Sequence, residues 1–344
     1  MFLHGQRPYL IAEIGANHNG DMDLARSMIE TAKEIGCDAV KFQSWDEGLF
    51  AKIVYGENRF LGDDYTKRSD HTLETIMGEF KVTREEMRAL AEHCRKVGIH
   101  FSTTPFSPSQ IDDVVAFGAP FIKIASMDLV SDYLLRGAAK TGLPVLLSTG
   151  FGTLEEIDHA VRTLEEAGAK DIVILHCLGL YPPPDEAMNL ANMQMLRQAF
   201  GYPVGFSDHT LGTEIPLAAM ALGAVVIEKH FTLDKTMFGW DHKISADVPE
   251  MAAICRARDR VHAALGTPTR RLTKAEATRK AEFRRSIVAA RDIAKGERLT
   301  QSDIDYKRPG RGLAPNLDTL VIGRVATRDI TADELLDWAD FSAS

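Results

Sequence analysis

The sequence predicts an α/β protein, a (β/α)₈ barrel followed by a small β-rich domain. Over about the first 265 residues, eight short apolar segments alternate with longer segments of helical periodicity. The apolar segments are nearly continuous, which is typical of strands covered on both faces. An open doubly wound sheet would not need eight units and would want a glycine-rich phosphate loop after its first strand. Residues 12–20, AEIGANHNG, do not match GxGxxG, so the barrel is preferred.

The predicted strands are short and rich in β-branched and aromatic residues. They are expected at residues 9–14, 39–43, 99–103, 121–126, 144–149, 171–177, 203–207 and 224–230. Clear helical patterns lie between them at 22–36, 83–98 and 153–168. Asp21 and Thr153 are N-cap residue types, and Gly168 is a typical helix end. The barrel domain is therefore expected to span residues 1–266.

The periodicity changes after residue 266. Residues 267–285 are basic and polar, which is typical of a linker or an exposed helix. Short β-like runs follow at 286–293 and 319–330, separated by turn-forming residues. We expect a linker at 267–283 and a second domain at 284–344. A domain of about 60 residues is marginal alone, so docking on the barrel or on a partner chain is expected.

Composition and charge exclude several classes of protein. The 40 Lys and Arg against 49 Asp and Glu give a net charge of −9, which argues against a general nucleic-acid binder. The four cysteines are scattered without a CxxC pair, which fits a reducing cytoplasm. The sequence shows neither a signal-peptide pattern nor a continuous apolar run of about 18 residues. We therefore expect a cytoplasmic protein with neither a membrane nor a nucleic-acid partner.

Polar side chains end nearly every predicted strand, where a barrel gathers its functional groups. They are Glu13, Lys41, Gln43, Thr103, Thr104, Lys123, Ser126, Ser148, His176, Ser207, His209, Glu228 and His230. A buried lysine needs a partner, and a structural ion pair would explain one such residue. Two lysines on the same rim, Lys41 and Lys123, are better explained by an anionic ligand. The neighbouring hydroxyls suit phosphate or carboxylate oxygens.

His209 and His230 follow the last two predicted strands. A lone histidine is more often a hydrogen-bonded core residue, but a pair on adjacent strands fits a metal site. Two imidazoles with open positions suit Mn²⁺, Fe²⁺, Co²⁺ or Zn²⁺ better than Mg²⁺, and such an ion could polarise a carbonyl. Glu13 is interpreted either as a charge partner for a lysine or as a proton-transfer group. Asp241 could reach the same mouth, and the long insertion at 44–80 is typical of a lid or an oligomer contact.

An ordered set of motifs resembles the sialic acid (N-acetylneuraminate) synthase family over nearly the whole chain. They are AEIGANHNG (12–20), VKFQS (40–44), STTPFS (102–107), FIKIAS (121–126), VLLSTG (145–150), HC followed by YP (176–182), GFSDHT (205–210) and EKHFT (228–232). Residues 284–313 resemble that family's antifreeze-like (SAF) domain. The resemblance implies a transferase that condenses phosphoenolpyruvate (PEP) with a 2-acetamido aldose and releases phosphate by C–O cleavage. It also implies a divalent metal, usually Mn²⁺.

The resemblance implies roles residue by residue. His209 and His230 would be metal ligands, and Glu13 would be the general acid or base, with Lys41 and Lys123 completing the catalytic set. The PEP carboxylate and phosphate would be held by these lysines with Thr104, Ser126, Ser148 and Ser207. Gln43, Tyr181 and Asp241 would face the sugar. Arg308 would reach the sugar from the other subunit of a domain-swapped homodimer.

The chain departs from the family pattern around the sugar. Leu178, Gly179 and Leu180 stand where Thr-Ser or Thr-Asn often follows HC, Trp240 stands where Pro is usual, and Met127-Asp128 replaces Gly-Glu. Because the anion and metal sets are retained, we interpret these changes as altered sugar choice. The expected acceptor resembles N-acetylmannosamine, and a legionaminic or pseudaminic type or another modified sugar is the alternative.

Three other classes of function fit parts of the sequence. A PEP-dependent synthase for a shorter 3-deoxy-ulosonic acid shares the barrel but lacks the appended domain. Ice binding requires a weakly charged surface, whereas residues 284–311 carry many Arg and Lys residues. A carbohydrate-binding barrel without turnover is the non-enzymatic alternative.

Overall fold

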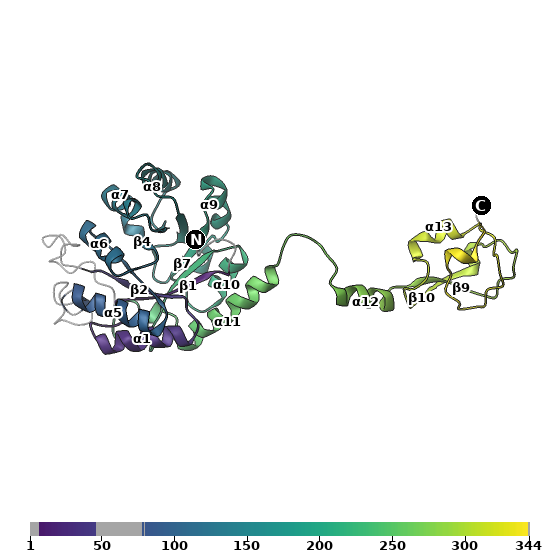
Figure 1. Ribbon diagram of the computed structural model, residues 1–344, viewed down its shortest axis with the longest axis horizontal. Helices are drawn as coiled ribbons and strands as arrows, with labels where there is room; N and C mark the ends of the chain where they lie inside the picture. Colours follow the sequence, from purple (N-terminus) through teal and green to yellow (C-terminus); the bar gives the residue numbers. More distant parts are fainter. Residues whose placement is uncertain (1–6, 46–77, 79, 343–344) are drawn as a thin grey trace. The chain divides into compact units, whose positions relative to one another are not determined.

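The computed structural model describes residues 7–45, 78 and 80–342. The chain divides into two compact units, Met1–Gly266 and Thr267–Ser344. In the first unit, helices ring the outside of the parallel strands (Figure 1). The predicted fold class, a (β/α)₈ barrel followed by a small β-containing unit, is confirmed. Most of the predicted 44–80 insertion, residues 46–77 and 79, lies outside the described residues.

Eight parallel strands form the barrel wall in the order β3-β2-β1-β8-β7-β6-β5-β4. Their bounds are β1 Tyr9–Gly15, β2 Ala39–Gln43, β3 His100–Thr104, β4 Ile122–Ile124, β5 Val145–Ser148, β6 Ile172–Cys177, β7 Val204–Asp208 and β8 Val226–His230. At the seam between β3 and β4, Ser102 Oγ donates to the Phe121 carbonyl oxygen at 3.1 Å. β4 is shorter than predicted because Ser126–Asp128 forms a 3₁₀ turn.

The helices of this unit cover the outer face of the strands. They are α1 Met22–Glu34, α5 Arg84–Val97, α6 Pro108–Ala116, α7 Asp132–Lys140, α8 Leu154–Glu166, α9 Asn192–Phe200, α10 Glu214–Ala221 and α11 Val248–Leu265. Asp21 caps α1 by accepting from the Asp23 and Leu24 N–H groups, and Thr153 forms a capping box with Glu156 at the start of α8. These caps satisfy N–H groups that lack partners within the helix.

Alternation along β1 explains how functional groups reach the barrel mouth. Tyr9 and Ile11 belong to a cluster of strand residues inside the barrel, whereas Leu10, Ala12 and Ile14 pack between strands and helices. Since side chains alternate with a period of two, Glu13 follows Ile11 on the inner face, one layer nearer the C-terminal end. β2 repeats the pattern, with Ala39 inside and Lys41 and Gln43 above it. The inner face is therefore apolar at the start of these strands and polar at their ends.

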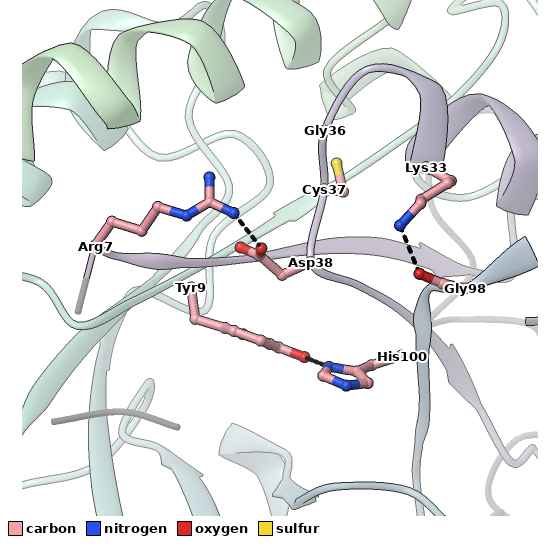
Figure 2. A pocket seen from close by; sticks show the side chains of 8 residues that line it. All are labelled: Arg7, Tyr9, Lys33, Gly36, Cys37, Asp38, Gly98 and His100. Atoms are coloured by element: carbon pink, nitrogen blue, oxygen red, sulfur yellow. Dashed lines mark hydrogen bonds and ion pairs between the residues drawn. The ribbon is translucent and has the colours of Figure 1, made fainter. Parts of the chain in front are cut away.

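A pocket of about 400 Å³ lies at the N-terminal ends of the strands. Figure 2 shows its polar groups paired with one another: Arg7 binds Asp38 at 3.0 Å, and Tyr9 Oη hydrogen-bonds His100 Nδ1 at 2.6 Å. Lys33 Nζ donates to the Gly98 carbonyl oxygen at 2.6 Å. Because these groups satisfy each other, we assign this pocket to the stability of the barrel floor, the usual role of that face.

The second unit begins with an exposed helix, α12 Lys274–Phe283, none of whose residues is buried. β9 Ser286–Ala289 and β10 Ile304–Lys307 pair antiparallel over a small separate core. The prediction of β structure at 319–330 is wrong in its first part, where Asp318–Val321 forms the short helix α13. Further along that segment, pairing consists of isolated bridges such as Ile293–Ile330.

The second unit contains an internal repeat that the sequence analysis missed. Arg291 binds Glu297 and Asp303, and Arg328 binds Glu334 and Asp340 with the same spacings. The two copies exchange contacts reciprocally. The Lys295 N–H donates to Asp329 at 2.7 Å, and the Ala332 N–H donates to Asp292 at 2.8 Å. This reciprocity indicates two halves related by an approximate twofold axis.

Among the described helices, none has the length and apolar character needed to span a bilayer.

Candidate active site

A pocket opens at the C-terminal ends of the barrel strands. It is lined by the predicted residues Glu13, Lys41, Gln43, Thr104, Lys123, Ser126, Ser148, Tyr181, Ser207, His209 and His230. Residues from all eight strands or the loops that follow them thus meet in one place. Of the remaining predicted residues, Asp241 lies beside His230 and Arg308 belongs to the second unit.

Two lysines and two carboxylates form a buried charge network at the base of this pocket. Lys41 Nζ lies 2.7 Å from Glu13 Oε2 and 3.9 Å from Glu228 Oε2. Lys123 Nζ lies 3.7 Å from Glu228 Oε1. Glu228 was predicted at a strand end but not among the site residues. The sequence spacing could have identified it, because Glu228 precedes His230 by two residues on β8 and residues two apart in a strand share a face.

Burial sets the protonation of these groups. It raises the pKa of Glu13 to about 7, against the opposing effect of Lys41. Burial also acts to raise the pKa of Glu228, but Lys123 and Lys41 outweigh it and hold that pKa below its ordinary value. The pKa of Lys123 is lowered by burial. Near neutral pH, Glu13 is therefore the carboxyl group that can take up or release a proton.

Hydroxyl groups surround the two ammonium groups. Thr104 Oγ1 accepts from Lys41 Nζ at 2.6 Å, and Ser207 Oγ donates to Glu228 Oε1 at 3.0 Å. Ser126 Oγ accepts from the Gly150 N–H at 3.0 Å. Ser148 Oγ is buried and has no hydrogen-bond partner among the described residues. A buried hydroxyl left in this state on a pocket wall indicates a position that a ligand oxygen would fill.

The two histidines face each other across the mouth, with ring centroids 5.5 Å apart. His209 Nδ1 hydrogen-bonds the Leu178 carbonyl oxygen at 2.7 Å, which leaves its Nε2 as the unprotonated nitrogen. Burial lowers the pKa of His209 to about 4 and that of His230 to about 3, so both rings are neutral at pH 7. His230 Nδ1 is buried without a hydrogen bond among the described residues. Neutral imidazoles, one oriented by a carbonyl, fit a divalent metal.

Tyr181 and Asp241 flank this histidine pair. The Tyr181 ring stacks on the His209 ring, with centroids 4.0 Å apart. Asp241 Oδ2 lies 3.6 Å from His230 Nδ1, and burial raises the pKa of Asp241 to about 6. Within the described residues no group of three or more His, Cys, Asp and Glu side chains suited to a metal is found, so the fit rests on the imidazole pair.

Apolar side chains complete the pocket wall, and sequence reasoning missed them. Trp45, Phe106, Met127 and Phe151 line the pocket, each directly after a strand or in the loop that follows it. Phe151 adopts φ +63°, and its ring lies over Gly179, where a Cβ atom would overlap it. The glycine that departs from the family pattern is therefore covered by an aromatic ring.

Other polar strand-end residues face away from the pocket. His176 Nε2 hydrogen-bonds the Met188 carbonyl oxygen at 2.7 Å, and Thr103 Oγ1 pairs with Ser44 Oγ at 2.9 Å. A third lysine at a strand end, Lys229, is buried against Asp208 at 2.7 Å. The hydrogen bonds and the ion pair of these residues stabilise the barrel, and the residues do not line the pocket.

A model of the NeuB family matches residues 28–270, and a model of the SAF domain matches residues 284–342. The chain is 40% identical over 336 residues to an uncharacterized protein of Methanocaldococcus jannaschii, covering 98% of this chain and 95% of that protein. It is 37% identical over 335 residues to the N,N'-diacetyllegionaminic acid synthase of Campylobacter jejuni, covering 96% and 99%.

Among solved structures, the N-acetylneuraminic acid synthetase of Leptospira borgpetersenii matches with a TM-score of 0.69 at 33% identity. The match covers 80% of this chain and 90% of that one. The SAF match identifies the appended domain, which argues against the alternative of a synthase for a shorter 3-deoxy-ulosonic acid, because such a synthase would lack it. The resemblance drawn from the ordered motifs is confirmed: the chain belongs to the NeuB family of PEP-dependent nonulosonic acid synthases and carries a C-terminal SAF domain.

Proposed function

We propose that this protein condenses PEP with a 2-acetamido sugar resembling N-acetylmannosamine, yielding a nonulosonic acid and phosphate. One observation carries the proposal. Two buried lysines, a buried hydroxyl with no partner among the described residues and a pair of neutral imidazoles line one pocket. A structural ion-pair network would account for the lysines alone. It would not account for Ser148 Oγ.

Lys41 and Lys123 bind PEP in this proposal, assisted by Thr104, Ser126, Ser148 and Ser207. Glu13 and Glu228 already balance the two ammonium charges in the pocket. A trianion entering this network favours protonation of Glu13, whose pKa burial has raised to about 7. The pocket then holds one more positive than negative side chain, and Glu13 holds a proton near the reacting centre.

His209 and His230 would hold a divalent metal, which family membership implies, and Mn²⁺ is the ion we propose. When bound, such an ion supplies Lewis-acid polarisation of the sugar aldehyde. Tyr181, stacked on His209, keeps one side of that ring out of water. Gln43, Tyr181 and Asp241 are proposed to face the sugar.

The bond changes are those of a carbon–carbon condensation. PEP C3 attacks the aldehyde carbon of the open-chain sugar, and the aldehyde oxygen takes the proton that Glu13 holds. The oxocarbenium left at C2 is attacked by water, and one proton of that water returns to Glu13. The C2–O bond to phosphate then breaks as the new hydroxyl oxygen forms the C2 carbonyl, and the hydroxyl proton leaves with the phosphate. Holding both substrates in one pocket supplies much of the rate through orientation.

A legionaminic-type sugar is the second candidate for the acceptor. The apolar Leu178-Gly179-Leu180 segment, with Phe151 over Gly179, favours a less polar sugar face than a hexose with all of its hydroxyls. The similarity to a diacetyllegionaminic acid synthase supports the same choice.

The test is phosphate release from PEP with a panel of amino sugars in the presence of Mn²⁺, combined with mass spectrometry of the product. We expect phosphate and a nonulosonic acid mass with at least one 2-acetamido sugar. PEP binding without phosphate release for any sugar would contradict the proposal and favour a barrel without turnover.

We propose further that residues 1–266 are the catalytic domain, 267–283 a linker and 284–344 the SAF domain. In a swapped homodimer, Arg308 would reach the partner's sugar. Mixing inactive Arg308→Ala and Lys123→Met chains tests this arrangement, because a shared site regains activity in mixed dimers and a self-contained site does not.

A further inference from the structure

A hydrogen-bonded chain links an aromatic side chain to the charge network of the pocket. Trp45 Nε1 donates to Gln43 Oε1. Gln43 Nε2 in turn donates to Glu13 Oε1 at 3.1 Å, and Glu13 Oε2 pairs with Lys41. All four residues line the pocket.

The indole determines which way the Gln43 amide points. An indole N–H can only donate, so it selects the amide oxygen whatever the protonation of Glu13. The amide nitrogen is then directed to Glu13, and because it carries two hydrogens, one remains for a ligand. Rotating the amide by 180° would bring its oxygen against Glu13 and its nitrogen against the indole. Trp45 therefore selects the orientation that offers a donor.

Aromatic neighbours hold Trp45 in this position. The Trp240 ring packs edge-on against it, with centroids 4.8 Å apart at 74°. The Phe106 ring lies at 5.9 Å, and Trp240 also contacts Phe80 at 6.4 Å. Because Trp45 is packed from two sides, its N–H is directed before any ligand arrives, which lowers the entropy cost of orienting Gln43.

We propose that Trp45 is a positioning residue for the acceptor sugar: its indole N–H fixes the Gln43 amide so that the sugar meets an N–H donor. This inference rests on the proposed function, in which Gln43 faces the sugar. The sugar group that faces Gln43 is then an acceptor, such as a hydroxyl or amide oxygen. PEP does not depend on Gln43, so its binding is unaffected.

The test compares Trp45→Phe with Phe80→Leu, a control that also loosens the aromatic cluster but lies outside the pocket lining and keeps the indole N–H that faces Gln43. Both variants are checked for wild-type thermal midpoints. For Trp45→Phe we expect the KM of the acceptor sugar to rise about three- to tenfold, the range of one neutral hydrogen bond. The KM of PEP and kcat should match those of Phe80→Leu. Equal acceptor KM values in the two variants would overturn the proposal.

A double-mutant cycle tests whether Trp45 acts through Gln43. Gln43→Met removes the amide, and Trp45→Phe in that background should add no further rise in acceptor KM. Additive effects would mean that Trp45 contacts the sugar directly, which also overturns the proposal. Calorimetric binding of N-acetylmannosamine or the best sugar of the panel distinguishes failure of the Trp45 proposal from failure of the proposed function. A chain that binds sugar without releasing phosphate refutes the proposed function, while the comparison of variants still decides the role of Trp45.

Discussion

Lys123 offers the sharpest separation between a structural ion pair and a ligand-binding group. Its Nζ is buried 3.7 Å from Glu228 Oε1, and its side chain is only 4% exposed. Lys123→Met leaves Glu228 with Lys41 at 3.9 Å as its remaining cationic neighbour. Removing one partner of a buried pair typically destabilises a protein by about 3 kcal/mol or more. Lys123→Met alone should therefore lower stability whichever role is correct.

The double variant Lys123→Met/Glu228→Gln resolves the ambiguity. It removes both charges, so the thermal midpoint should return most of the way to wild type. PEP affinity should not return. A charge-assisted hydrogen bond to an anion contributes about 1.5–3 kcal/mol, so its loss weakens PEP binding about 10- to 150-fold.

Isothermal titration calorimetry gives the PEP Kd, and scanning calorimetry gives the thermal midpoints of the two units. Glu228→Gln alone is the matched control, and it should bind PEP at least as tightly as wild type because a carboxylate facing the anion is gone. If the double variant regains both stability and wild-type PEP affinity, Lys123 is only an ion-pair partner and does not bind PEP.

Three further outcomes follow from the structure. Excess chelator should abolish phosphate release and added Mn²⁺ should restore it, and full activity in chelator would exclude a metal role. His230→Asn should weaken Mn²⁺ binding by calorimetry far more than His176→Asn, whose ring hydrogen-bonds a backbone carbonyl outside the pocket, and equal losses would show that His230 is not a ligand. Hydrogen bonds from Thr300 lower the pKa of Asp303 below 3.8, so its stabilisation is present above that pH and is lost as pH falls through the lowered value. Asp303→Asn should speed amide hydrogen exchange in the second unit at pH 7, and its difference from wild type should shrink toward pH 3. A difference that stays constant with pH, or an equal effect of Asp305→Asn at an exposed position, would show that the Asp303 carboxylate is not the source of this stability.

The barrel and the polar half of its site were predictable because both depend on local periodicity. A two-residue alternation along β2 is enough to put Lys41 and Gln43 on one face, and convergence of strand ends then brings them to Lys123. Partner choice within the mouth was not predictable. Whether Lys123 meets Glu228 or Glu13 depends on how far each strand is staggered around the barrel, which no short segment encodes.

Other features escaped prediction for different reasons. Trp45 and Phe151 act from loops whose backbone path the residue types do not specify. The run at 319–330 is apolar and β-branched in part, but only Val321 of its helical portion is buried, so tertiary context overrode local preference. The repeat between 291–303 and 328–340 could have been found in the sequence, because both ranges contain Arg-Asp-Ile, Glu, Leu and Asp at the same spacings. Its physical sign, the reciprocal exchange of contacts, became visible only in three dimensions.

The packing of Phe151 on Gly179 makes the two positions epistatic. Any side chain introduced at 179 must first displace the ring, and the ring can swing outward because Phe151 is 72% exposed. A mutational path that reintroduces a polar residue at 179 therefore depends on what position 151 already holds. Directed evolution of this enzyme toward new acceptors should randomise the two codons together, because libraries that vary either one alone would sample variants whose neighbouring residue still suits the original pocket.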